Sequence, residues 1–182
     1  MEQAQAATLR LADRLEVRAS TLLALHRSDR LTLGEFRTGV ALDVARTNTA
    51  VVQLSDVAVA QEATRQRGER VRPLGLRPTA EQIDHDRIRA DVDRILAERP
   101  AVDDLAASQE ARLRRLARSE PLLTAAATVH TAMERHGATG WTRLVDRDPC
   151  PVCRGWADGV TRAATVRMAR HLGCGCIQQP VF

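Results

Sequence analysis

The sequence predicts a mainly α-helical protein, with a helical body of about five helices followed by a small C-terminal α/β tail. Two observations support this fold class. Up to about residue 137, apolar residues recur at steps of three and four, which is the period of an amphipathic helix. Beyond that point the composition changes, because residues 139–182 contain all four cysteines, both tryptophans and five of the ten glycines of the 182-residue chain.

Residues 1–67 are predicted to form a long helical hairpin, whose first helix covers about residues 3–26. Thr32 and Glu35 have the spacing of a capping box, in which each side chain satisfies an exposed amide at a helix start. The second helix therefore begins directly after Thr32. It ends before Gly68, because glycine readily adopts the left-handed conformation that closes helices.

Residues 68–78 hold two prolines and two glycines and are predicted to be a linker. A helical region follows over residues 79–137. Thr79 and Gln82 suggest a cap at its start, Pro121 begins its last helix and Gly137 ends it. Three helices are predicted in this region, at about residues 80–98, 104–117 and 120–136.

The last unit, residues 138–182, is predicted to be a compact Cys-rich tail. Trp141, Arg143 and Val145 alternate with their neighbours in the manner of a short strand, up to about Asp146. A unit of this size can bury little apolar surface by itself, so it needs another source of stability. We expect Trp141 and Trp156 to pack over that source as a miniature core.

The cysteine motif indicates what this source is. The chain reads Cys150-Pro-Val-Cys153 and then, after 17 residues, His171-Leu-Gly-Cys174-Gly-Cys176. Zinc takes four nitrogen or sulfur ligands in a tetrahedron, and these intervals are typical of two-lobed structural zinc sites. We predict that Cys150, Cys153 and Cys174 bind Zn²⁺ together with either Cys176 or His171. Four protein ligands leave no position for a water molecule, so we expect no hydrolase activity and no enzyme.

Other interpretations of the cysteines stay open at this stage. Two disulfides would require an oxidising compartment, and reduced thiols without metal are a further alternative. A thiol oxidoreductase would use Cys150 and Cys153, since Cys-Pro-x-Cys resembles redox-active turns. Such turns follow a strand and open a long helix, whereas residues 154–159 are a poor helix start.

The remaining clusters of polar residues indicate surface structure. The acids of residues 84–93 are interspersed with arginines, which predicts a solvated helix face with local ion pairs. The sequence contains no phosphate-binding glycine loop, no serine nucleophile elbow and no HExxH motif. We expect surface or packing roles for four histidines, His26, His85, His130 and His136, and a solvated helix face for Arg112, Arg114, Arg115 and Arg118.

Charge and hydropathy limit the possible partners. The net charge is +4, but basic and acidic residues are mixed along the whole chain, whereas DNA-binding proteins concentrate basic charge on one face. A zinc-containing nucleic-acid-binding accessory or regulatory protein remains the alternative function. It would bind through the tail arginines Arg147, Arg154, Arg162, Arg167 and Arg170. No apolar run reaches the roughly 18 residues of a membrane span, and the N-terminus does not resemble a secretory signal.

The tail resembles the C-terminal region of phage head-morphogenesis proteins, also called MuF-like minor capsid proteins. Members of that family carry a Trp, an Asp-Arg-x-Cys-x-x-Cys segment, an Asp/Gly turn and a His-Pro-x-Cys-Arg-Cys element. The matching residues here are Trp141, Asp146-Arg147-Asp148-Pro149-Cys150-Pro151-Val152-Cys153, Asp158-Gly159 and His171-Leu172-Gly173-Cys174-Gly175-Cys176. Leu172 replaces the family's proline, Gly175 replaces its arginine, and one extra residue precedes the first cysteine.

The resemblance implies a minor structural protein of a tailed-phage head, present in multiple copies in the head interior or connector region. Its partners would be the portal protein, the major capsid protein or both, and it would be made in the host cytoplasm, where thiols stay reduced. All 27 basic residues are arginine, with no lysine and no tyrosine, which indicates a high-GC genome. That composition fits an actinobacteriophage.

Overall fold

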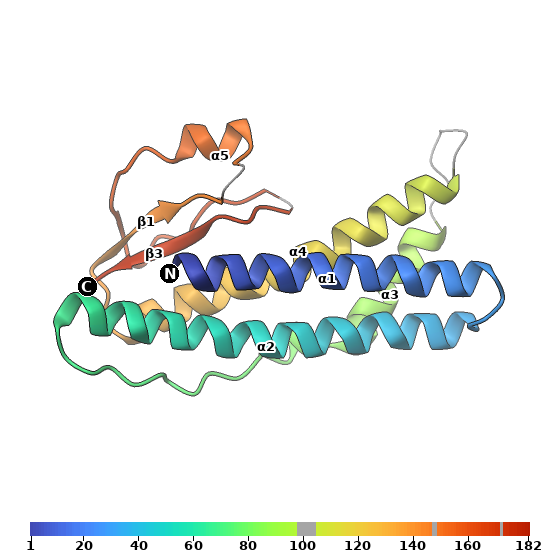
Figure 1. The fold of residues 1–182 in the computed structure, drawn as a ribbon, viewed down its shortest axis with the longest axis horizontal. Helices are drawn as coiled ribbons and strands as arrows, with labels where there is room; N and C mark the ends of the chain where they lie inside the picture. Colours follow the sequence, from blue (N-terminus) through green and yellow to red (C-terminus); the bar gives the residue numbers. More distant parts are fainter. Residues whose placement is uncertain (98–104, 147–148, 172) are drawn as a thin grey trace.

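The computed structural model describes residues 1–97, 105–146, 149–171 and 173–182. Within these ranges the chain is mainly helical, as predicted, with a small antiparallel sheet near the C-terminus (Figure 1). The long helices are Glu2–Arg27 (α1), Leu33–Arg67 (α2), His85–Ala97 (α3) and Leu105–Arg135 (α4). The described part of the body thus contains four long helices and one 3-10 turn, Glu81–Ile83 (η1), where about five helices were predicted.

Helices α1 and α2 run antiparallel as a hairpin, with both chain termini near one end of the molecule (Figure 1). The predicted capping box is present: the Thr32 hydroxyl accepts the Glu35 amide at 3.2 Å, and the Glu35 carboxylate accepts the Thr32 amide at 2.8 Å. Gly68 closes α2 with a left-handed φ of 74°. Gly137 likewise has a φ of 71° directly after α4, so the predicted helix ends are confirmed.

A first apolar core joins the helices of the body. Phe36 is fully buried in it, and its ring stacks on His26 with centroids 5.4 Å apart, which confirms a packing role for that histidine. The core side chains are Leu15, Ala19, Leu22, Leu23, Phe36, Val40, Ala41, Val44, Ile88, Val92, Leu113 and Ala117. Because α1, α2, α3 and α4 all contribute, burial of their apolar stripes stabilises each helix against the others.

The prediction of two separate helices between residues 104 and 136 was wrong. Helix α4 continues through Pro121 to Arg135, while Asp104 lies outside the described residues. Proline in a helix interior removes one backbone hydrogen bond and costs about 3 kcal/mol. Helix α4 packs against α1 and α2, and Ala117 and Leu122, on either side of this proline, are buried; this burial offsets the local cost.

The single helix predicted at residues 80–98 is divided into η1 and α3. The Asp84 side chain causes the division, since its Oδ1 accepts the amides of Asp86 and Arg87 at 3.0 Å each and so begins a new helix. The predicted cap at Thr79 and Gln82 is present, but it begins the 3-10 turn.

The connector after α2 contains neither helix nor strand and is fastened to α2. The buried Asp56 carboxylate accepts the amides of Leu74 and Leu76, each at 3.0 Å. The proposed unit limits at residues 67, 78 and 137 stay predictions.

The tail contains a three-stranded sheet in the order β2-β1-β3. The central strand is Gly140–Leu144 (β1), flanked by Arg162–Ala163 (β2) and Ile177–Val181 (β3). The predicted strand is therefore confirmed and ends at Leu144. A short helix, Pro151–Trp156 (α5), lies between β1 and β2 in the sequence and completes the expected α/β tail.

A second apolar core lies between the tail and the helical body. It contains Val59 of α2, three residues of α4 and five residues of the tail, including three cysteines. The full set is Val59, Val129, Ala132, Met133, Trp141, Cys153, Met168, Cys174 and Cys176. Both tryptophans were predicted to pack over the cysteine site, but only Trp141 is buried in this core. Trp156 is 36% exposed, and the Arg143 guanidinium lies 5.0 Å from its ring centroid.

Two glutamine side chains add polar contacts across the same boundary. Gln5 of α1 donates to the carbonyl oxygen of Gly175 at 2.9 Å. Gln66 of α2 donates to the carbonyl oxygen of Pro180 at 2.8 Å and accepts the Phe182 amide at 2.9 Å. Both ends of the Cys174–Phe182 segment are therefore held by the body.

Replacing Gly175 by alanine is expected to destabilise the protein by about 1–3 kcal/mol, because a side chain here would overpack the boundary. A Cβ at this position would lie 2.7 Å from Oδ2 of Asp146 and 2.8 Å from Cδ2 of Leu9. Thermal unfolding of Gly175→Ala measures the loss. Gly155→Ala is the matched control, since nothing lies within 4 Å of its Cβ position. An equal melting temperature for both variants would contradict this packing.

Candidate metal centre

Two segments of the tail bring the predicted ligands together. Cys150 is the N-cap of α5, with Pro151 at the first helical position and Cys153 one turn later. This turn brings the two sulfur atoms to the same side of the α5 N-terminus. The Cys153 amide donates to the Cys150 Sγ at 3.4 Å. His171 approaches from the loop after β2, and Cys174 and Cys176 directly precede β3.

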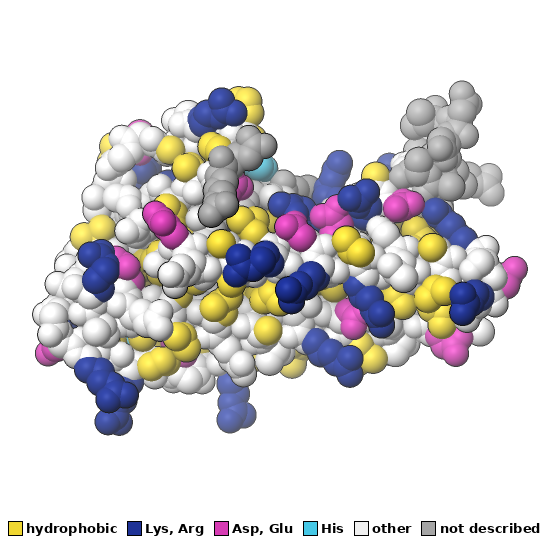
Figure 2. Space-filling model, in the orientation of Figure 1, with side chains coloured by type: hydrophobic (Ala, Val, Ile, Leu, Met, Phe, Trp, Pro, Cys, Tyr) yellow, Lys and Arg dark blue, Asp and Glu magenta, His cyan; other side chains and the backbone are white. Residues whose placement is uncertain are grey.

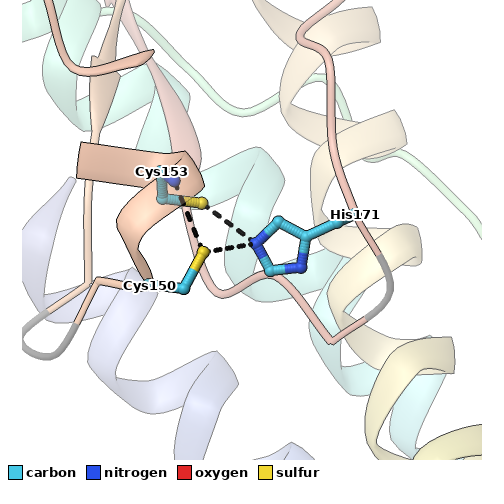
Figure 3. A group of neighbouring side chains, drawn as sticks. All are labelled: Cys150, Cys153 and His171. Atoms are coloured by element: carbon cyan, nitrogen blue, oxygen red, sulfur yellow. Dashed lines mark hydrogen bonds between the residues drawn. The ribbon is translucent and has the colours of Figure 1, made fainter. Parts of the chain in front are cut away.

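The ligand atoms are within contact distance. His171 Nε2 lies 3.0 Å from the Cys150 Sγ and 3.1 Å from the Cys153 Sγ, and the three side chains point toward one another (Figure 3). The Cys153 Sγ also lies 3.4 Å from the Cys174 Sγ. Two trios result, Cys150–Cys153–His171 and Cys153–Cys174–Cys176, with ligand atoms within 4.8 Å inside each. This cluster could hold a metal ion, and Cys153 is common to both trios.

Burial differs from one ligand to the next. Cys153, Cys174 and Cys176 are at most 2% exposed, whereas Cys150 is half-buried and His171 is exposed. The centre therefore has a closed side within the tail–body core and an open side at the surface.

The four thiols are free and their proton affinities differ. Burial raises the pKa of Cys153 to about 11, whereas the backbone amide of Cys153 lowers the pKa of Cys150. A hydrogen bond from the Cys176 thiol lowers the pKa of Cys174 to about 4, and the same bond raises the pKa of Cys176.

Three residues around the cluster carry no sequence signal that would have marked them. The backbone amide of Asp146 hydrogen-bonds the Cys176 thiol, and Gln5 holds the carbonyl of Gly175 between the last two cysteines. Arg170 donates to the Cys174 carbonyl oxygen, although its sequence position suggested only a DNA contact. The contact of Gln5 joins residues 170 positions apart, so no local sequence pattern could predict it.

The other predicted clusters have the expected surface roles. In the acidic stretch, Asp91 pairs with Arg87 and Arg94, and Asp93 pairs with Arg37. In the arginine cluster, Arg114 and Arg118 pair with acids of α1. Basic and acidic side chains are interspersed along the face that shows α1 and α2 (Figure 2).

None of the four histidines outside the motif belongs to either ligand trio of the described residues. His130 is buried with its Nε2 3.6 Å from Glu134, and burial lowers the pKa of His136.

Among the described helices, none is both long and apolar enough to cross a membrane.

No protein-family model, curated protein or solved structure matches this chain.

Adding Zn²⁺ to the metal-free protein near neutral pH is expected to release at least one proton per bound ion. The Cys153 thiol, with its pKa of about 11, keeps its proton until a metal displaces it. Because binding expels protons, metal affinity should rise as the pH rises and fall as the pH drops. An indicator dye in weakly buffered solution measures the release. Stoichiometric binding without proton release would contradict the protonation assigned to Cys153.

Proposed function

We propose that this is a structural protein in which one zinc ion fastens the C-terminal tail to the helical body. One observation supports this more than any other. Five thiol and imidazole groups from two tail segments meet where the tail contacts α2 and α4. Thiolates and imidazoles at this spacing are the donors that tetrahedral zinc sites use.

Within the cluster we assign the four ligands as Cys150, Cys153, Cys174 and His171. His171 contacts both cysteines of the first segment, and Cys174 lies 3.4 Å from Cys153. Cys176 is the remaining group, and its thiol hydrogen-bonds the Cys174 sulfur.

Such a site is structural because all four positions are filled by side chains. Structural zinc sites in small domains supply about 10–16 kcal/mol of apparent binding free energy, which appears as folding free energy. The short α5 also differs from the long helix that follows the dithiol of an oxidoreductase.

We further propose the role that the family resemblance implies, that of a minor protein of a tailed-phage head. Apolar side chains on the tail surface support a docking role, since four of them are 36–53% exposed. These residues are Val152, Trp156, Val160 and Val166. In this proposal, the zinc ion keeps this surface rigid so that portal or capsid subunits can bind it. Several copies of the protein would be present in each phage head.

The nucleic-acid-binding alternative receives less support, because most of its arginines make contacts within the protein. Arg162 pairs with Asp158, Arg154 donates to the Pro149 carbonyl, and Arg170 is half-buried. Arg147 lies outside the described residues, and Arg167 is exposed.

The zinc assignment is tested by elemental analysis and limited proteolysis of two serine variants. The parent protein should bind about one zinc ion per chain, and Cys150→Ser should lose most of it because a ligand is missing. Cys176→Ser is the matched control and should retain the ion. Digestion should remove the tail of Cys150→Ser faster than that of the parent. A Cys150→Ser variant with full zinc content and full protease resistance would refute the proposal.

The head role is tested by co-purification with the portal and major capsid proteins encoded by the same genome. The parent should bind one of them, and Trp156→Ala should bind at least about 10-fold more weakly if the tail surface is the contact. Val17→Ala on α1, also exposed, is the control. Failure to bind either partner, combined with duplex DNA binding that weakens steeply with salt, would favour the alternative function.

A further inference from the structure

Arg170 occupies an unusual position between the cysteines and the helical body. Its Nη1 donates to the Leu122 carbonyl of α4 at 2.7 Å, and its Nη2 donates to the Cys174 carbonyl. The side chain directly precedes His171 in the chain. One guanidinium therefore connects α4 to the turn that carries a proposed zinc ligand.

The charge balance of the centre gives this guanidinium a second role. A zinc ion bound by three thiolates and one neutral imidazole carries one net negative charge. Arg170 is half-buried and close enough to Cys174 and Cys176 to interact with both electrostatically. The two hydrogen-bond partners of this cation are carbonyl oxygens, which carry no full negative charge, and burying a charge without a counter-charge is costly.

We infer that Arg170 is the counter-ion and positioning residue of the metal centre: it offsets the negative charge of the zinc–thiolate group and fixes the Cys174 backbone. This inference rests on the proposed zinc site and extends it to a residue outside the ligand set. Loss of the guanidinium charge leaves the thiolates more electron-rich and the turn less well held.

Two variants separate the charge from the hydrogen bonds. Arg170→Lys keeps the positive charge, whereas Arg170→Gln keeps an amide donor and removes the charge. Arg167→Gln is the matched control, because Arg167 is exposed and lies in the same loop. Both substitutions at position 170 are polar, so neither creates an apolar surface that would misfold the tail.

Affinity is measured by competition with a chromogenic zinc chelator. Arg170→Gln should bind Zn²⁺ about 10–100-fold more weakly than the parent, which is the usual effect of removing a residue that supports a metal ligand. Arg170→Lys should lose only a few-fold, and Arg167→Gln should bind as the parent does.

Cobalt substitution supplies a readout that a purely structural role would not change. In the Co²⁺-loaded Arg170→Gln variant, the sulfur-to-cobalt charge-transfer bands should move to longer wavelength, because the thiolates have lost a nearby cation. In Arg170→Lys and Arg167→Gln these bands should stay where the parent has them.

The outcomes distinguish this inference from the zinc proposal itself. If the parent binds neither Zn²⁺ nor Co²⁺, the proposed function fails. If the parent binds and Arg170→Gln has the parent's affinity, the role of Arg170 is refuted. Weaker binding with unshifted charge-transfer bands would likewise overturn the counter-ion role.

Discussion

The structure depends on the meeting of the cysteine thiols inside the core that joins the tail to the helices. Cys153 belongs to both ligand trios and to this core, where it lies with Val59 of α2 and Val129 of α4. A tail with one short sheet and one short helix buries too little apolar surface to be stable alone. Binding of a metal at this place would stabilise the tail and the boundary together.

The Cys174-Gly175-Cys176 segment both supplies candidate metal ligands and contacts the helical body. Its side chains face the thiol cluster, while its backbone carbonyls accept hydrogen bonds from Arg170 and from Gln5 of α1. Gly175 has no space for a side chain. An arginine at this position, as in the family that the tail resembles, would require Leu9 and Asp146 to move.

Local sequence signals predicted the features that depend on few residues. The capping box at Thr32, the glycines that close α2 and α4, and the strand at Trp141 all follow from residues close together in the chain. The five candidate ligands were likewise found by spacing, and the structure brings them into one cluster.

The rest depended on contacts between distant residues. Local sequence predicts Pro121 as a helix start, but packing of α4 against two other helices outweighs its local cost. The exposure of Trp156 and the position of Arg170 against Cys174 are set by how the tail lies on the body. No periodicity or motif contains that information.

Hydrogen–deuterium exchange with and without Zn²⁺ tests most directly whether a metal fastens the tail to the body. Removing the metal should cause large losses of protection in β1, β3 and the N-terminal turn of α1, where Gln5 contacts Gly175. The helices around Phe36 should keep their protection, because their core does not include the cysteines. Equal protection of the tail in the two states would contradict the account.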